Sequence, residues 1–185
     1  ITDDKEWERI SLALEYLHRA QFYIDDTPGI TVPEMKAKTR RLGGVDCVVV
    51  DYLQLLTSGK RNEGRVQEVS EITRNLKIMA KDLNIPVIVL SQLNRNSAAG
   101  REKKDHRPTM SELRESGSIE QDADIIILLY REGYFDSSTG EEKAVDPTSA
   151  EAIIAKNRHG GTGTAQLSWN GDYTLFTTRD SSIEE

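Results

Sequence analysis

Four side chains with the chemistry of a nucleotide site lie at or just beyond the ends of predicted strands. Asp51 ends the run VVVD, Gln92 follows VIVLS, and Lys156 and Arg158 follow AEAIIA. Parallel sheets bind ligands at the carboxyl ends of their strands, where a carboxylate can hold Mg²⁺ and a glutamine can orient a water or sense a γ-phosphate. In an extended chain Lys156 and Arg158 would point to one side, as two cations that could stabilise a phosphoryl group. Each feature alone also fits a polar strand end or a solvated turn.

The segment RESGSIEQDAD, residues 114–124, has the composition of a helix start that could bind an anion. Ser118 and Gln121 fit a capping box, which predicts a short helix with Ser118 at its N-cap. Gly117 precedes that helix, whose free backbone N–H groups could bind a phosphate, and Arg114 could add a second contact. A plain, well-capped helix start explains the same residues.

Basic residues form two local clusters in loop-like sequence. The first comprises Lys60, Arg61 and Arg65, and the second comprises Arg101, Lys103, Lys104 and Arg107. The formal net charge of −7 argues against a protein that coats nucleic acid by bulk attraction, so any nucleic-acid site must be local. The alternative is two solvated surface loops.

The elements that would hold these side chains follow one another in an α/β order. Apolar periodicity predicts helices over 7–17, 33–42 and 66–83. Apolar runs predict strands over 22–24, 45–52, 86–93, 124–131, 150–156, 164–169 and 173–179. The run 45–52 is almost continuously apolar, which is typical of a parallel strand covered on both faces, and Asn170-Gly171-Asp172 is a hairpin signal. We predict an α/β fold with a mostly parallel sheet flanked by helices and a C-terminal antiparallel hairpin.

Length and composition predict a single domain over residues 1–185. No apolar run is long enough to span a membrane and no leader precedes the helix at Trp7, so we expect a cytoplasmic protein without a membrane partner. Cys47 is the sole cysteine, which excludes an internal disulfide, and its apolar neighbours predict a buried structural thiol. The three histidines lack partners at ligand spacing, so a zinc site is not expected.

Four stretches together resemble the motor domain of bacterial replicative DNA helicases of the DnaB family. They are VVVDYLQLL, RVQEVSEITRNLKIMAKDLNIPVIVLSQLNR, RPTMSELRESGSIEQDADIIILLYRE and AIIAKNRHGGTGTAQLSW, in an order that extends from about Phe22 to Phe176. The resemblance implies a RecA-like fold and a homo-hexameric ring around single-stranded DNA. It also implies ATP hydrolysis coupled to translocation and duplex unwinding, with primase and a helicase loader as partners.

The resemblance assigns a role to each nucleotide-site residue. Asp51 matches the Walker B aspartate, which binds Mg²⁺ through water, and Gln92 matches the switch glutamine between nucleotide and DNA. Lys156 and Arg158 match the pair that reaches the γ-phosphate of ATP bound by the adjacent subunit, with Arg158 as the arginine finger.

The resemblance also assigns the residues that contact DNA. Arg114, Glu115 and Gly117 match the pore-loop residues that hold the DNA backbone. A second pore loop is matched by the first basic cluster, Lys60, Arg61 and Arg65.

One departure from the family is large. No phosphate-binding loop of the form G-x-x-x-x-G-K-[ST] occurs in the 185 residues. In the family this loop, the catalytic glutamate and an N-terminal domain precede the point that matches Ile1. We therefore expect the later portion of a longer helicase that does not hydrolyse ATP alone. Alternatives are a non-catalytic, ring-forming or DNA-contacting module of the same fold, and a related ATPase of repair or recombination.

Overall fold

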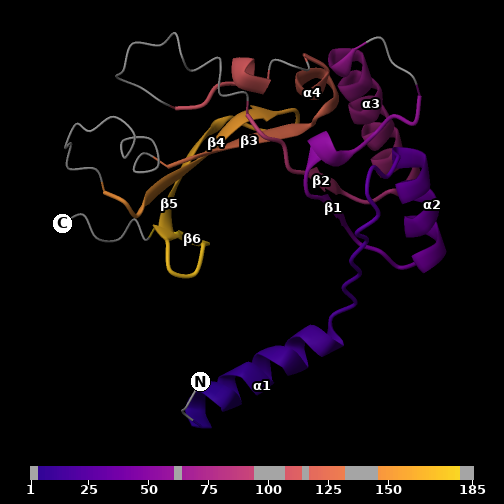
Figure 1. Ribbon diagram of the computed structural model, residues 1–185. Helices are drawn as coiled ribbons and strands as arrows, with labels where there is room; N and C mark the ends of the chain where they lie inside the picture. The colour runs from indigo at the N-terminus through magenta and orange to yellow at the C-terminus, as the bar shows by residue number, and fades with distance from the viewer. Residues whose placement is uncertain (1–3, 61–63, 94–106, 114–116, 132–145, 180–185) are drawn as a thin grey trace.

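The computed structural model describes residues 4–60, 64–93, 107–113, 117–131 and 146–179 (Figure 1). Its helices are α1 (Asp4–Arg19), α2 (Val32–Leu42), α3 (Arg65–Leu83) and α4 (Gly117–Asp122), with short 3₁₀ helices η1 (Leu53–Leu55) and η3 (Met110–Leu113). Its strands are β1 (Val48–Val50), β2 (Val87–Val89), β3 (Ile125–Tyr130), β4 (Ser149–Asn157), β5 (Gly163–Asn170) and β6 (Leu175–Thr178).

The strands form one parallel pair and one antiparallel sheet. In the parallel pair, Val49 of β1 lies opposite Ile88 of β2. The other four strands are antiparallel in the order β3-β4-β5-β6. The predicted α/β class and the C-terminal hairpin of β5 and β6 are confirmed, and the antiparallel pairing extends further than predicted, because β3 and β4 also take part in it.

Two clusters of buried side chains form the core, and α4 lies at their junction. The inner face of α3, including Ile72 and Met79, packs against β1 and η1 in the first cluster. The second cluster consists of Leu113 of η3 and of Ile126 and Leu128, which lie on the buried face of β3. Ile119 of α4 packs against both clusters, so the position of α4 depends on α3 and on β3 together.

The helices α2 and α3 end where the sequence predicts, because their caps are encoded locally. Thr31 and Glu34 form a capping box at the start of α2, and Gly43 closes the helix with a φ of 65°. Asn84 closes α3 in the left-handed conformation, with a φ of 53°.

Three predictions about the first half of the chain are wrong. Residues 22–24 belong to no strand, because no described strand pairs with them. The strands β1 and β2 have three residues each rather than eight, and Val49 is 63% exposed, since the described helices cover only one face of the pair. Cys47, just before β1, is exposed rather than buried.

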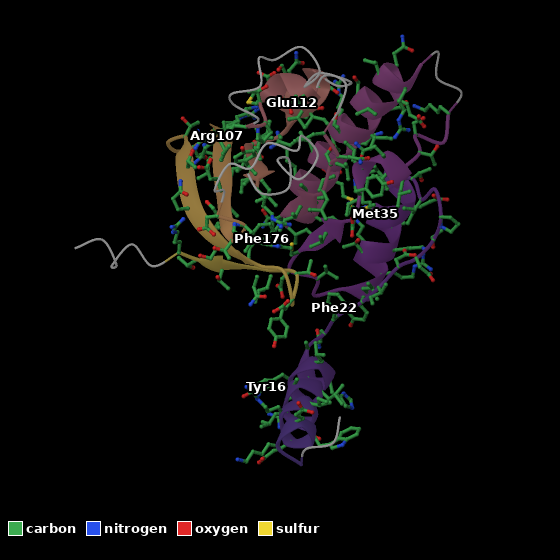
Figure 2. All side chains as sticks on the ribbon, turned by 60° about the vertical axis from the view of Figure 1, so that its left-hand side comes forward. Tyr16, Phe22, Met35, Arg107, Glu112 and Phe176 are labelled. Atoms are coloured by element: carbon green, nitrogen blue, oxygen red, sulfur yellow. The ribbon has the colours of Figure 1, made fainter. Side chains whose placement is uncertain are left out.

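Helix α1 extends away from the remaining elements (Figure 1). The predicted helix over 7–17 is confirmed, but Trp7, Leu14 and Leu17 are exposed on it. Tyr16 of α1 and Phe22 of the following segment also lie outside the body of the protein in Figure 2. Among the described residues, no helix is long and apolar enough to cross a membrane.

Candidate functional site

The carboxyl ends of β1 and β2 bring Asp51 and Gln92 to the same edge of the parallel pair. Backbone hydrogen bonds continue beyond the strands, from the Leu90 N–H to the Val50 carbonyl at 2.9 Å and from the Leu53 N–H to the Leu90 carbonyl at 2.8 Å. Asp51 directly follows β1, Gln92 lies three residues after β2, and both are exposed. The shared edge predicted from the sequence is therefore present.

Gln54 stabilises this edge through hydrogen bonds to Ser91 and Gln92, a role that the sequence interpretation did not assign to it. Its Nε2 donates to the Ser91 hydroxyl at 3.3 Å and to the Gln92 backbone carbonyl at 3.4 Å, and its Oε1 accepts from the Gln92 N–H at 3.5 Å. One amide side chain on η1 therefore holds the segment after β2. The signal in the sequence was a single polar residue between Leu53 and Leu55 in an otherwise apolar run.

Asp51 has the properties required of a carboxylate that holds Mg²⁺ through water. Its side chain is exposed, and no described residue forms a hydrogen bond or ion pair with it. The described residues contain no cluster of three or more metal-ligating His, Cys, Asp or Glu side chains. A single carboxylate, completed by water and phosphate oxygens, fits Mg²⁺, which retains several of its waters in nucleotide sites.

Lys156 and Arg158 converge on the C-terminal end of α4. Because β4 runs antiparallel to β3, Lys156 lies opposite Ile126, close to the point where β3 follows α4. The Lys156 ammonium donates to the carbonyls of Glu120 and, at 2.7 Å, of Ala123. The Arg158 guanidinium donates to the Gln121 carbonyl at 3.0 Å.

These contacts satisfy carbonyls that a helix end leaves unpaired and place positive charge at the negative end of the helix dipole. The alternating spacing of Lys156 and Arg158 thus brings both side chains to one side of the chain, as predicted. Arg158 keeps a side-chain exposure of 45%, so part of its guanidinium faces solvent.

Asp124 is a second residue of this site that the sequence interpretation did not assign. Its Oδ2 accepts from the Lys77 ammonium of α3, and its Oδ1 lies 3.4 Å from Arg158 Nη1. Its backbone carbonyl accepts from the Arg158 N–H at 2.8 Å. The hydrogen bond from Lys77 lowers the pKa of the Asp124 carboxyl, so this group is ionised at neutral pH.

The start of α4 differs from the prediction. The helix begins at Gly117, so Ser118 lies inside it and cannot serve as the N-cap. The Ser118 hydroxyl is buried and has no hydrogen-bond partner among the described residues. A Cβ placed on Gly117 would meet no atom of the described residues within 4 Å, so these residues do not require a glycine there. Arg114 and Glu115 lie outside the described residues.

Both described members of the first basic cluster pair with acids of α3. Lys60 forms an ion pair with Glu71, and Arg65 forms one with Glu68 at 2.7 Å. Arg65 also donates to the Gln54 carbonyl at 3.0 Å, which links this cluster to the edge that carries Asp51. Arg61 lies outside the described residues.

The second basic cluster is represented in the described residues by Arg107, which lies beside the strands of the antiparallel sheet (Figure 2). Its guanidinium binds Glu151 through two bonds, Nε to Oε2 at 2.8 Å and Nη2 to Oε1 at 2.7 Å. Gln166 also donates to this carboxylate. The pair fixes the segment before η3 to β4, whereas Arg101, Lys103 and Lys104 lie outside the described residues.

The fold and this arrangement define an α/β protein with a candidate nucleotide site beside a short helix that could contact nucleic acid. Residues 1–178 match the model of the DnaB-like helicase C terminal domain, and the chain belongs to this family. The predicted relationship to the DnaB family is thereby confirmed.

Individual relatives agree with this assignment. The replicative DNA helicase DnaB of Geobacillus stearothermophilus and the replicative DNA helicase DnaC of Bacillus subtilis are each 44% identical to the chain over 98% of its length. A solved DnaB-like replicative helicase, described together with its interactions with primase, matches 97% of the chain at a TM-score of 0.85 and 38% identity. A second solved structure, described as an ATPase domain, matches 97% of the chain at a TM-score of 0.83 and 38% identity.

The chain spans only part of these relatives. It covers 39% of both curated helicases, 43% of the solved DnaB-like helicase and 62% of the solved ATPase domain chain. The activity of the whole protein, with its substrates and partners, therefore belongs to the proposal that follows.

Proposed function

We propose that the chain is part of a hexameric replicative DNA helicase that uses ATP hydrolysis to move along single-stranded DNA and unwind the duplex. The observation that carries this proposal is the convergence of Lys156 and Arg158 on α4 in a member of the DnaB-like family. It connects the candidate phosphate-contacting pair directly to the helix that follows the candidate DNA-contacting residues.

In the intact protein, ATP and Mg²⁺ would occupy the edge at β1 and β2. Asp51 would hold Mg²⁺ through water, and the ion would neutralise phosphate charge. Gln92 would respond to the nucleotide from the neighbouring strand end. Lys156 and Arg158 would reach the γ-phosphate bound by the adjacent subunit, since arginines supplied in trans stabilise the transition state of phosphoryl transfer.

DNA would pass the opposite, N-terminal end of α4. Gly117 would allow the phosphate backbone to approach closely, because no side chain of the described residues fills the space beside it, and Arg114 and Glu115 would flank the contact. The first basic cluster, Lys60, Arg61 and Arg65, would form a second loop near the DNA. We further propose primase and a helicase loader as partners and, from this role, a cytoplasmic location.

The principal test is Arg158→Ala in the intact helicase. We expect ATP turnover to fall by about 10³-fold or more, the range for arginine fingers, with the fold retained. Arg41→Ala, which removes an exposed arginine at the end of α2, is the matched control and should leave turnover unchanged. Normal turnover by Arg158→Ala would contradict the role.

Mixed rings test whether Arg158 acts on the neighbouring subunit. Subunits with Asp51→Asn lack the proposed magnesium ligand but keep Arg158, whereas Arg158→Ala subunits keep Asp51. Mixing two inactive variants should restore part of the activity, because some interfaces then combine both intact residues. Failure to exceed the unmixed variants would mean that Arg158 does not act across an interface.

The DNA contact is tested by Arg114→Ala and by the salt dependence of single-strand binding. Loss of one phosphate contact should weaken binding and reduce the slope of log K against log salt by about 0.7. An unchanged slope would argue against the assignment. The 185-residue chain alone should not hydrolyse ATP, because its sequence contains no phosphate-binding loop.

A further inference from the structure

Asp124 fixes both the backbone and the side chain of Arg158. Its carbonyl accepts the Arg158 N–H at 2.8 Å, and its Oδ1 lies 3.4 Å from Arg158 Nη1. Two contacts from one residue restrict the backbone of Arg158 and the direction of its guanidinium together. Asn157 holds the turn that follows, since its Nδ2 donates to the Gly161 carbonyl and its Oδ1 accepts from the His159 N–H, both at 3.3 Å.

Lys77 in turn fixes the Asp124 carboxylate. It lies in the middle of α3, with its side chain 22% exposed, and donates to the carboxylate oxygen that does not face Arg158. Lys77 and Arg158 thus hold opposite oxygens of one carboxylate. Thr73, one turn earlier on α3, donates to Asp122 at 2.7 Å and anchors the same end of α4.

We propose that Asp124, held by Lys77, is a positioning residue for Arg158 in the hydrolysis of ATP bound to the adjacent subunit. This inference rests on the proposed function. Asp124 contacts neither nucleotide nor DNA in this role. It holds the guanidinium in one direction before the neighbouring phosphate arrives, so the entropy cost of orienting this group does not add to the reaction barrier.

The test is Asp124→Asn in the intact helicase, with kcat and KM for ATP measured separately. The amide oxygen of asparagine can still accept a hydrogen bond, and the backbone carbonyl is unchanged, so the fold should survive. We expect kcat to fall by about 10- to 100-fold with KM unchanged, because orientation of a group that acts in the transition state is lost. Asp124→Glu should restore part of the loss, since it returns the charge.

A double-mutant cycle separates positioning from a structural role. Once Arg158 is alanine, Asp124 has nothing to position, so adding Asp124→Asn should cause no further loss of kcat. A purely structural role would make the two losses multiply and would overturn the proposal. Lys77→Met tests the same proposal from the other side of the carboxylate. It should lower kcat by itself, and it should cause no further loss of kcat when combined with Asp124→Asn.

The matched control is Asp82→Asn. Asp82 pairs with Lys36 between α2 and α3, and the side-chain exposures of that pair, 24% and 41%, resemble the 22% and 41% of Lys77 and Asp124. Because this pair does not contact Arg158, its loss should leave kcat unchanged. If Arg158→Ala lowers turnover as expected while Asp124→Asn keeps the wild-type kcat, this inference alone fails. Wild-type turnover in Arg158→Ala would instead remove the proposed function.

Discussion

At the scale of single residues, Glu151 shows how a carboxylate can be retained inside a small antiparallel sheet. It is 7% exposed, and Arg107 and Gln166 donate hydrogen bonds to its oxygens. Burial of a charge without such partners is costly, so the bidentate guanidinium is what allows an ionised side chain here. The hydrogen bonds from Arg107 lower the pKa of Glu151 below its ordinary value of 4.5.

Arg107→Met should destabilise the chain at neutral pH by about 1–3 kcal/mol, because a buried carboxylate loses its charged partner. Since the folded-state pKa is the lower one, this contribution is complete above the ordinary glutamate pKa. It is lost as the pH falls through the folded-state value. The free energies of unfolding of the two proteins, measured with urea at a series of acid pH values, should therefore converge as the pH falls.

The control for this prediction is Arg19→Met. Arg19 pairs with Glu15 on the surface of α1, with side chains 76% and 58% exposed, so solvent screens the interaction and no measurable change is expected. A constant difference between Arg107→Met and wild type throughout the acid range would show that ionisation of Glu151 contributes nothing.

Residue identities alone predicted part of the site. Asp51 and Gln92 follow apolar runs, and Lys156 and Arg158 alternate, so local sequence placed them at strand ends. Gln54 and Asp124 were missed, because their side chains meet distant segments of the chain: Ser91 lies 37 residues from Gln54, and Lys77 lies 47 residues from Asp124. A spacing pattern contains no information about which distant segment a side chain will meet.

At the scale of elements, α4 illustrates the limit of local signals. The spacing of Ser118 and Gln121 fits a capping box, yet the helix starts at Gly117 and the Ser118 hydroxyl is buried. Packing of Ile119 against both core clusters sets the position of this six-residue helix. Tertiary contacts therefore override the capping pattern in so short an element. In α2, where Thr31 and Glu34 do form the box, the local signal and the structure agree.

Ser118→Ala distinguishes the two descriptions of α4. If Ser118 were the N-cap, the substitution would cost about 1 kcal/mol. In the structure it removes a buried hydroxyl without a partner among the described residues, so we expect stability to be unchanged or to rise by up to about 1 kcal/mol. Chemical denaturation of the two proteins provides the measurement, and a clear destabilisation would favour the capping description.

Thr31→Ala is the companion measurement at the start of α2. There the hydroxyl accepts from the Glu34 N–H and donates to the Glu34 carboxylate. Removing it should destabilise the chain by about 0.5–2 kcal/mol, the range for a lost N-cap. Opposite outcomes at Thr31 and Ser118 would show that a cap has to be judged from geometry rather than from sequence spacing.

At the scale of the whole molecule, the described residues leave two rows of aliphatic side chains uncovered. Val49 and Ile88 lie side by side on the parallel pair, 63% and 52% exposed. On β3, alternate residues Ile125, Ile127 and Leu129 are each 55–56% exposed. Apolar patches of this kind usually mark a contact surface. The continuous apolarity of 45–52 predicted a strand covered on both faces, whereas in the described residues only one face of β1 is covered.

The covered and uncovered faces of β1 allow a matched pair of substitutions. Val49→Thr changes an exposed side chain and should alter stability by no more than about 0.5 kcal/mol, whereas Val50→Thr places a hydroxyl at a site 6% exposed and should cost about 1–3 kcal/mol.

The exposed face can also be detected directly. The isolated chain should bind a hydrophobic dye such as ANS, and the double substitution Val49→Thr with Ile88→Thr should reduce that binding. If the chain is part of a longer helicase, as proposed, we expect additional chain to cover this face, so dye binding by the intact protein should be weak before any substitution. Strong dye binding by the intact protein that falls on Val49→Thr would show that the face stays open and is available to a partner.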